Sequence, residues 1–166
     1  KVLVLKPDLP EAQNNLGSAL KDQGELDEAV ACYRKALVLK PDFEDARFNL
    51  GNALKDQSKL DEAIACYRKA LVLRPDFVEA HLQLGHAFKD QGKLDEAVAC
   101  YQKGLMLQPD LEEAHLNLGN AFKGQDRQDE AIDCYRKALL LNSENAEARW
   151  ALTMSQIPVM YDSCLL

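Results

Sequence analysis

The apolar residues of this chain recur at intervals of three and four positions, in blocks separated by short polar segments. Residues 10–43 contain two such blocks. The first has its apolar positions at Ala12, Leu16, Ala19 and Leu20. The second has them at Ala29, Val30, Tyr33, Ala36 and Leu37. Such intervals place side chains on one face of an α-helix, so the pattern predicts two amphipathic helices, which we expect to be antiparallel.

The same two blocks return every thirty-four residues. The landmarks of the repeat are a glycine (Gly17, Gly51, Gly85, Gly119), a proline (Pro7, Pro41, Pro75, Pro109), an alanine (Ala29, Ala63, Ala97, Ala131) and a tyrosine (Tyr33, Tyr67, Tyr101, Tyr135). A fixed period of this length indicates units that bury their apolar faces against one another. The predicted fold is an open stack of helix pairs, with a broad surface on which another molecule can bind.

Polar residues and prolines mark the expected ends of these helices. Four aspartates, Asp8, Asp42, Asp76 and Asp110, each precede a carboxylate by three residues. In three of the four the pair is Asp-x-x-Glu, close to a capping box, so we expect the aspartates to begin the first helix of each unit. The preceding proline ends the previous second helix. Gly24 and Gly92 fit a left-handed residue that closes the first helix, and Asp27-Glu28 fits the first turn of the second.

The repeating glycine lies in the middle of a predicted helix. Glycine costs about 1 kcal/mol relative to alanine there, so its recurrence indicates that two helices approach closely. Ala29 and Ala36 recur on the opposite helix. We expect the ring of Tyr33 and its equivalents to fill the space between one unit and the next.

Charge and composition narrow the classes of partner. The formal net charge is −7 and the sequence pI is about 5.0. Nucleic-acid binding depends on clustered Lys and Arg, so we expect no nucleic-acid partner. No apolar run approaches the eighteen or so residues of a membrane span, so we expect no membrane partner either.

Four of the five cysteines occupy one position of the repeat: Cys32, Cys66, Cys100 and Cys134. Packed helices are about 8–10 Å apart, beyond the roughly 7 Å Cα separation that a disulfide allows. We therefore expect small buried thiols at helix contacts, in the cytoplasm or another reducing intracellular compartment. Cys164 lies in an irregular segment, where it could be a free thiol.

These landmarks resemble those of the tetratricopeptide repeat, whose period and glycine, alanine and proline positions they share. The resemblance covers four units, at 10–43, 44–77, 78–111 and 112–145. Residues 1–9 match the end of a second helix, which suggests a longer array, 146–157 match a partial fifth unit, and 158–166 are irregular. Two features depart from the family: its tryptophan is replaced by Gln13, Arg47, His81 and His115, and Lys123-Gly124-Gln125-Asp126 moves the helix-ending glycine.

The resemblance implies an all-α, right-handed solenoid whose first helices line a concave groove. Its groove positions fall in three rows here: Asn15, Asn49, Gln83 and Asn117; Ser18, Asn52, His86 and Asn120; and Lys21, Lys55, Lys89 and Lys123. A carboxamide both donates and accepts hydrogen bonds, so a row of them suits the backbone of an extended peptide. The alternative is that each amide bonds the neighbouring helix within the stack. Carboxylates outnumber lysines nearby, which favours a polar or basic peptide.

No residue pattern indicates catalysis. His81 and His115 are repeat equivalents, and His86 lies five residues after His81, which is not a metal-ligand spacing on a helix. No nucleophile with an adjacent base and no phosphate-binding glycine loop is present. We expect no active site, no metal and no cofactor, and the function that the sequence favours is a protein interaction scaffold.

Two alternatives to the scaffold function stay open, and the first of them rests on the carboxyl-terminal segment. Residues 146–157 predict one further first helix, with Thr153 at the glycine position, that could cap the stack. The stretch from Trp150 to Tyr161 resembles the segment that joins such repeats to the catalytic region of SPINDLY-type or O-GlcNAc-transferase-like glycosyltransferases. That resemblance implies the substrate-recognition arm of a protein glycosyltransferase. The other alternative is self-association through the exposed end helices.

Overall fold

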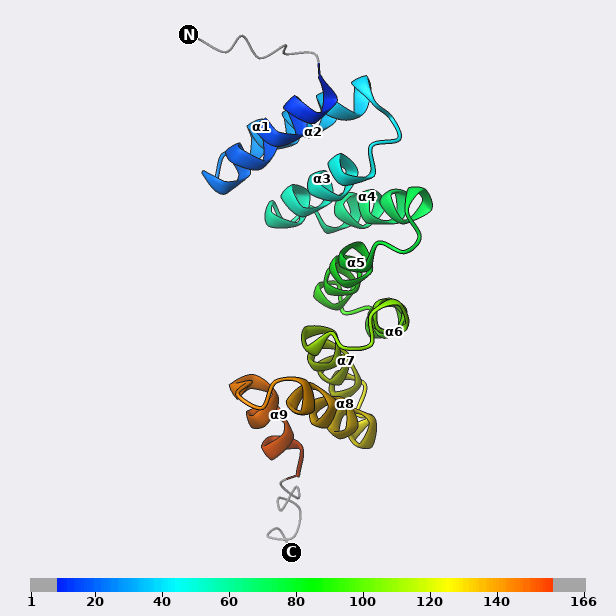
Figure 1. Ribbon diagram of the computed structural model, residues 1–166. Coiled ribbons are helices and arrows are strands. Elements are labelled where there is room, and N and C mark those ends of the chain that lie inside the picture. Colours follow the sequence, from blue (N-terminus) through cyan, green and yellow to red (C-terminus); the bar gives the residue numbers. More distant parts are fainter. Residues whose placement is uncertain (1–8, 157–166) are drawn as a thin grey trace, which may run out of the picture. The chain divides into compact units, whose positions relative to one another are not determined.

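The computed structural model describes residues 9–156, and every regular element among them is an α-helix (Figure 1). The helices are α1 (Pro10–Asp22), α2 (Leu26–Leu39), α3 (Glu44–Asp56), α4 (Leu60–Leu73), α5 (Val78–Asp90), α6 (Leu94–Leu107), α7 (Glu112–Gly124), α8 (Gln128–Leu141) and α9 (Ala146–Gln156). This confirms the all-α prediction and the two helices expected in each complete repeat.

The chain divides between Lys93 and Leu94 into two compact units. In the first unit, α1 packs on α2, α2 on α3, α3 on α4 and α4 on α5. In the second, α6 packs on α7, α7 on α8 and α8 on α9. Each unit is therefore a run of helices in which every helix packs against its neighbours in the sequence.

Alanine and tyrosine of the second helix form the centre of each helix pair. Ala29, Tyr33 and Ala36 are fully buried in α2, and their equivalents in α4 and α8 are equally buried. The close approach predicted from the mid-helix glycine is confirmed: a Cβ built on Gly17 would lie 2.8 Å from Cε1 of Tyr33. The tyrosine ring therefore packs against the glycine of its own unit, and its filling of the space toward the next unit remains a prediction.

The helix ends differ in part from the prediction. Asp42, Asp76 and Asp110 do not occupy the N-cap of the first helices, and Asp8 lies outside the described residues. The residues at the N-cap are Leu9, Phe43, Phe77 and Leu111, and none makes a side-chain cap hydrogen bond. The chain turns through Pro41 and Asp42, with the Phe43 amide donating to the Lys40 carbonyl at 3.2 Å. The proline prediction is confirmed, since α2 ends at Leu39 and Lys40 is extended.

The turn between the two helices of a repeat keeps one geometry whatever residue occupies it. Gly24 and Gly92 are left-handed, with φ of 82° and 73°, as predicted. The equivalent residues Ser58 and Asp126 adopt φ of 61° and 59° although they carry a Cβ. The displaced Gly124 therefore does not alter the fourth turn: it becomes the last residue of α7, and Asp126 takes the left-handed position.

A glutamine at the end of one first helix is hydrogen-bonded to the preceding repeat. The Nε2 atom of Gln57 donates to Oδ1 of Asp27 at 2.8 Å, and Gln91 donates in the same way to Asp61. In the second unit Gln125 donates to Asp95 at 2.7 Å. The aspartate at the start of the second helix thus both complements the helix dipole, as predicted, and accepts a bond from the next repeat.

The two terminal helices expose residues that are buried elsewhere. Leu16 of α1 is 49% exposed, whereas its equivalents Leu50 and Leu84 are each 6% exposed. Helix α9 confirms the further helix predicted at residues 146–157 as far as Gln156. The expectations for residues 1–8, for Cys164 and for the part of the transferase-like stretch beyond Gln156 lie outside the described residues.

Candidate functional site

The candidate site is the face of the first helices that carries the three predicted polar rows, which we call the first-helix face. In the first row, Asn49 is half-buried and its Nδ2 donates to Oδ1 of Asn14 at 3.0 Å. Gln83 is also half-buried, and its Oε1 accepts from Nζ of Lys55 at 2.7 Å. Asn15, on the terminal helix α1, is exposed. Asn49 and Gln83 therefore have their amide orientation set by a neighbouring first helix.

The second row is tied to the buried tyrosines. The hydroxyl of Tyr67 donates to Oδ1 of Asn52 at 2.8 Å. In the second unit the Tyr135 hydroxyl donates to Oδ1 of Asn120 at 2.9 Å. With the oxygen directed at the tyrosine, the NH₂ group of each asparagine is directed away from it. In Asn120 this group donates to Oε1 of Glu147 on α9 at 3.4 Å.

Ser18 also accepts a hydrogen bond from a buried tyrosine, but its own hydrogen has another partner. Its Oγ accepts from the Tyr33 hydroxyl at 3.2 Å and donates to the carbonyl oxygen of Asn14 at 3.2 Å. A serine hydroxyl has one donor, and here the helix backbone uses it. The first repeat therefore lacks the directed donor that Asn52 provides in the second.

His86 occupies the second row in α5 and is half-buried. Burial and, to a smaller extent, the positive charges of Lys55 and Lys89 together lower the pKa of its imidazole to about 4, against a smaller opposing effect of Asp90. The ring is therefore neutral at pH 7. Because both lysines act on it, the first-helix face is locally positive at this repeat.

The remaining lysines have partners on their own unit. Lys21 lies 3.9 Å from Oδ2 of Asp56, a partly exposed pair. Lys123 lies 5.6 Å from the ring centroid of Trp150 in a cation–π contact. The first unit thus brings together Asn49, Gln83, Asn52, His86, Lys55 and Lys89 on neighbouring helices, and the second unit carries Asn117, Asn120 and Lys123 on α7.

The apolar position next to the first row completes the face. Leu82 and Leu116 are buried there, and Phe48 packs its ring 4.7 Å from that of Phe77 and 5.9 Å from that of Tyr67. At the same position of α1 stands Asn14, which is 9% exposed and holds Asn49. Sequence reasoning missed this role of Asn14. The signal for it was a carboxamide at a position where the other repeats have an apolar residue.

The environments of Cys66 and Cys134 do not favour the thiolate. Burial raises the pKa of the Cys134 thiol to about 11 and raises the pKa of Cys66 as well. A thiol above its ordinary pKa stays protonated at neutral pH, and the thiolate is the reactive form. Across residues 9–156, no three His, Cys, Asp or Glu side chains are grouped as a metal site, and no helix is long and apolar enough to cross a membrane.

Family models match the chain along most of its length. A model described as a TPR repeat matches residues 17–58, 51–92 and 85–126, and a tetratricopeptide repeat model matches residues 112–145. The chain belongs to the tetratricopeptide repeat (TPR) family. The predicted helical-repeat solenoid is therefore confirmed as the fold class.

Solved TPR-like structures superpose on most of the chain. A crystal structure of MamA has a TM-score of 0.80 at 27% identity, covering 86% of this chain and 83% of that one. PilF of Pseudomonas aeruginosa has a TM-score of 0.80 at 22% identity, over 88% of this chain and 67% of that one. Cut9, in the APC/C hetero-tetramer Cut9–Hcn1, has 0.82 at 18% identity, over 90% and 30%. A search of curated proteins gave no match.

Where the TPR family has a tryptophan, Arg47, His81 and His115 of this chain bind the loop between repeats. The Nη2 atom of Arg47 donates to the carbonyl oxygen of Pro41 at 2.7 Å. His81 and His115 each place Nε2 2.9 Å from the carbonyl oxygen of the proline six residues earlier, Pro75 and Pro109. These side chains hold the loop between repeats against the first helix, which the constant six-residue spacing to proline could have indicated.

Proposed function

We propose that this chain is an interaction scaffold that holds an extended polar segment of a partner protein along its first-helix face. Membership of the TPR family supports a protein-binding role in general. The more specific proposal rests on the amide groups of the two rows. It takes the carboxamides as ligands for the backbone of the bound segment.

The observation that carries the proposal is the Tyr–Asn hydrogen bond of the second row. Tyr67 and Tyr135 are fully buried, and each orients one asparagine by donating to its oxygen. An amide held in one orientation loses little conformational freedom when it binds a ligand, so more of each hydrogen bond appears as affinity. The directed NH₂ group of Asn52 suits a backbone carbonyl oxygen of an extended chain, and that of Asn120 has one hydrogen for this use besides the one it donates to Glu147.

The alternative, in which each amide bonds the neighbouring helix within the stack, is partly compatible with this proposal. Asn49 and Gln83 bond neighbouring helices, as a purely structural ladder requires. A carboxamide has two donor hydrogens and an oxygen with two lone pairs, so one bond to the stack leaves further hydrogen-bonding capacity. The positive charge of Lys55 and Lys89 near His86 argues against a strongly basic segment at that repeat.

The test is peptide capture by a variant that lacks first-row amides. Twelve-residue peptides selected from a random phage-displayed library on the wild-type chain provide the probes. Replacing Asn15, Asn49 and Asn117 by alanine should weaken their affinity, since each hydrogen bond contributes about 0.5–1.5 kcal/mol. Methylation of the peptide backbone nitrogens and replacement of backbone amides by esters should weaken binding more than changes in side-chain sequence.

The matched control is Gln57→Ala, which removes a carboxamide from the turn after α3, away from the two rows. Titration calorimetry on both variants measures the affinities, and circular dichroism verifies that the helices are intact. Unchanged capture by the triple variant would remove the amide ladder from the proposed mechanism. Equal losses in the triple variant and the control would assign the effect to stability rather than to contact.

The exposed face of α1 favours self-association as a second candidate function. Leu9 and Leu16 are 50% and 49% exposed on this terminal helix. Apolar side chains that are buried in the interior repeats are available here to a second copy of the chain. Light scattering over a concentration series should show a mass that rises with concentration and returns to the monomer value in Leu16→Glu. A constant monomer mass in the wild type would exclude this candidate.

A further inference from the structure

The second helices carry apolar side chains that the fold leaves in solvent. One position near the end of each second helix is occupied by Val38, Val72, Met106 or Leu140, which are 80%, 81%, 74% and 85% exposed. The next residue, Leu39, Leu73, Leu107 or Leu141, is 40–42% exposed in every repeat. Scattered exposed apolar residues need no explanation, but the same exposed pair recurs at one position of the second helix in every repeat.

The identity of the residue changes along the repeats while its apolar character does not. Valine, methionine and leucine differ in volume and branching, and no packing contact requires any of them at such exposure. Valine is also a weaker helix former than a lysine or glutamate at an exposed helix position. Stability and solubility would both favour a charged residue there, so the apolar side chain has another use.

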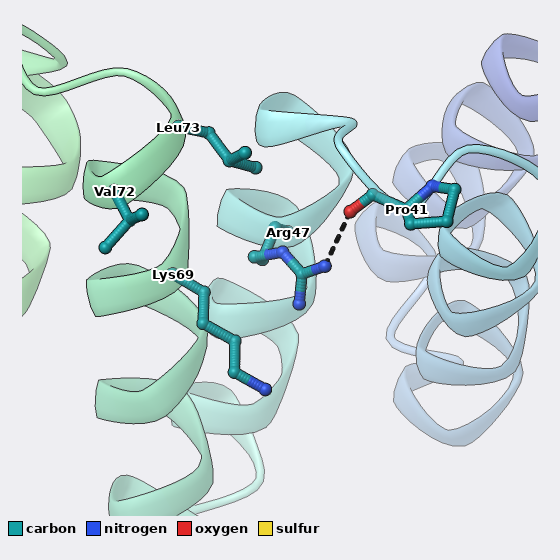
Figure 2. A pocket seen from close by; sticks show the side chains of 5 residues that line it. All are labelled: Pro41, Arg47, Lys69, Val72 and Leu73. Carbon is teal, nitrogen blue, oxygen red and sulfur yellow. Dashed lines mark hydrogen bonds between the residues drawn. The ribbon is translucent and has the colours of Figure 1, made fainter.

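A pocket lies beside this apolar pair in the first unit, and Figure 2 shows its lining. Lys69, Val72 and Leu73 come from α4, while Pro41 and Arg47 come from the loop before α3 and from α3 itself. Its volume is about 210 Å³. The hydrogen bond from Arg47 to the Pro41 carbonyl fixes one wall, so the pocket is preformed.

The second unit repeats the pocket at the equivalent position. Its lining residues are Pro109, Asp110, His115, Lys137, Leu140 and Leu141, around a volume of about 180 Å³. His115 there holds the Pro109 carbonyl as Arg47 holds that of Pro41. Two separate occurrences with corresponding linings indicate that the pocket is a regular product of the repeat.

The charge beside the first pocket is positive. Lys69 is exposed, and none of the ion pairs formed within residues 9–156 gives it a carboxylate partner. Arg47, Lys69 and Arg34 all act to lower the pKa of the nearby Cys66 thiol, and only Glu62 opposes them among charged groups, although burial leaves that pKa raised. Glu62 is itself paired with Arg34 at 3.3 Å. An apolar surface beside two cations, neither of which forms an ion pair within residues 9–156, is therefore presented to a partner.

We propose that the second-helix patch, defined by Lys69, Val72 and Leu73 with Arg47, is a second docking surface for an acidic, amphipathic segment of a partner protein. A large apolar side chain of that segment packs on Val72 and Leu73. An adjacent carboxylate pairs with Lys69 at the mouth of the pocket. The patch lies on second helices and is independent of the amide rows of the first-helix face.

Charge favours a protein segment over an anionic membrane as the occupant. The chain as a whole has a net charge of −7, which repels an anionic lipid surface of much larger area than the patch. A short segment needs only the local field of Lys69 and Arg47. In the second pocket, His115 stands in place of the cation Arg47 and Asp110 is part of the lining, so that copy should bind the same segment more weakly.

Fluorescence anisotropy with a labelled synthetic peptide tests the proposal on the intact chain. The probe is a ten-residue peptide of alternating Glu-Leu pairs, and two comparison peptides carry Lys in place of Glu or Ser in place of Leu. The wild type should bind only the first. Lys69→Glu and Val72→Asp should each weaken that binding about tenfold, since they remove a charge pair or an apolar contact.

Two control variants localise the effect. Ala31→Asp adds the same charge to an exposed position of α2, in the preceding repeat, and Asn49→Ala alters the first-helix face. Neither should change binding of the acidic probe. Absence of probe binding by the wild type, or an equal loss in Ala31→Asp, would overturn the proposal. Sedimentation of the chain with phosphatidylserine vesicles, abolished by Val72→Asp, would instead assign the patch to a lipid surface.

Discussion

Replacing Gly51 by alanine tests the central packing feature of the fold. Gly51 lies in the middle of α3, and a Cβ built there would be 2.6 Å from Cε1 and 2.9 Å from Cδ1 of Tyr67. Carbon atoms pack at about 3.5–4.0 Å, so the new methyl group would overlap the ring by roughly 1 Å. The ring has little room to move, because it is fully buried and its hydroxyl is held by Asn52.

Two opposing terms set the magnitude of the change in stability. Alanine is favoured over glycine in a helix by about 1 kcal/mol. Forcing an extra methyl group into a packed core costs about 1–3 kcal/mol, occasionally more, and an overlap of this size belongs at the upper end of that range. We therefore expect Gly51→Ala to lower the free energy of unfolding by about 1–2 kcal/mol, in spite of its higher helix propensity.

Urea denaturation followed by circular dichroism at 222 nm measures this effect. The cause is isolated by a double-mutant cycle, in which Tyr67→Leu should relieve the overlap and recover at least about 1 kcal/mol of the loss in Gly51→Ala. Gly24→Ala provides the control, because Gly24 is left-handed and no atom lies within 4 Å of the place that an alanine methyl group would take there. It should cost backbone strain without coupling to Tyr67. A Gly51→Ala chain as stable as the wild type would refute the reasoning.

Burial, hydrogen bonding and titration give three further predictions. Leu50→Ala should lower the free energy of unfolding by about 2–5 kcal/mol and Leu16→Ala by much less, because only Leu50 is buried, and urea midpoints compare them. Tyr67→Phe should cost about 1 kcal/mol by the same assay and weaken binding of selected peptides, because the Asn52 amide loses its fixed orientation. His86→Asn should reduce the loss of stability between pH 7 and pH 4. The pKa of His86 is lowered to about 4 in the folded state, so as the pH falls the unfolded chain binds this proton first and the folded state loses stability. Identical pH profiles of the variant and the wild type would contradict this.

The sequence predicted the helix pairs well because their determinants are local and repeated. The helices are determined by apolar intervals of three and four, by a proline after a second helix and by a glycine in each first helix. Each of these features has its effect within a few residues or across one helix contact. The capping prediction failed because it also used only local spacing. Asp42 lies in a turn that is set by Pro41, and helix α3 begins at Glu44, one residue later than the spacing alone suggested.

The hydrogen-bond partners of the candidate site could not be predicted in the same way. Asn49 and Asn14 are adjacent in space but come from different repeats, and the bond between Gln57 and Asp27 joins residues thirty positions apart. The offset between repeats decides which side chains meet, and no single-residue preference encodes it. The binding of a peptide by these rows and the repeat boundaries themselves remain predictions, since hydrogen bonds within the chain neither require nor exclude a ligand.

The tyrosine of each repeat links the stability of the stack to the chemistry of its surface. A buried phenol hydroxyl needs an acceptor, and for Tyr33, Tyr67 and Tyr135 the second-row residue supplies it from the first helix. Serine and asparagine both meet that need, but Ser18 donates its only hydrogen to the helix backbone, whereas Asn52 keeps its NH₂ group for another partner. Packing therefore fixes that a polar residue stands at this position, and the choice among polar residues determines what the repeat can bind.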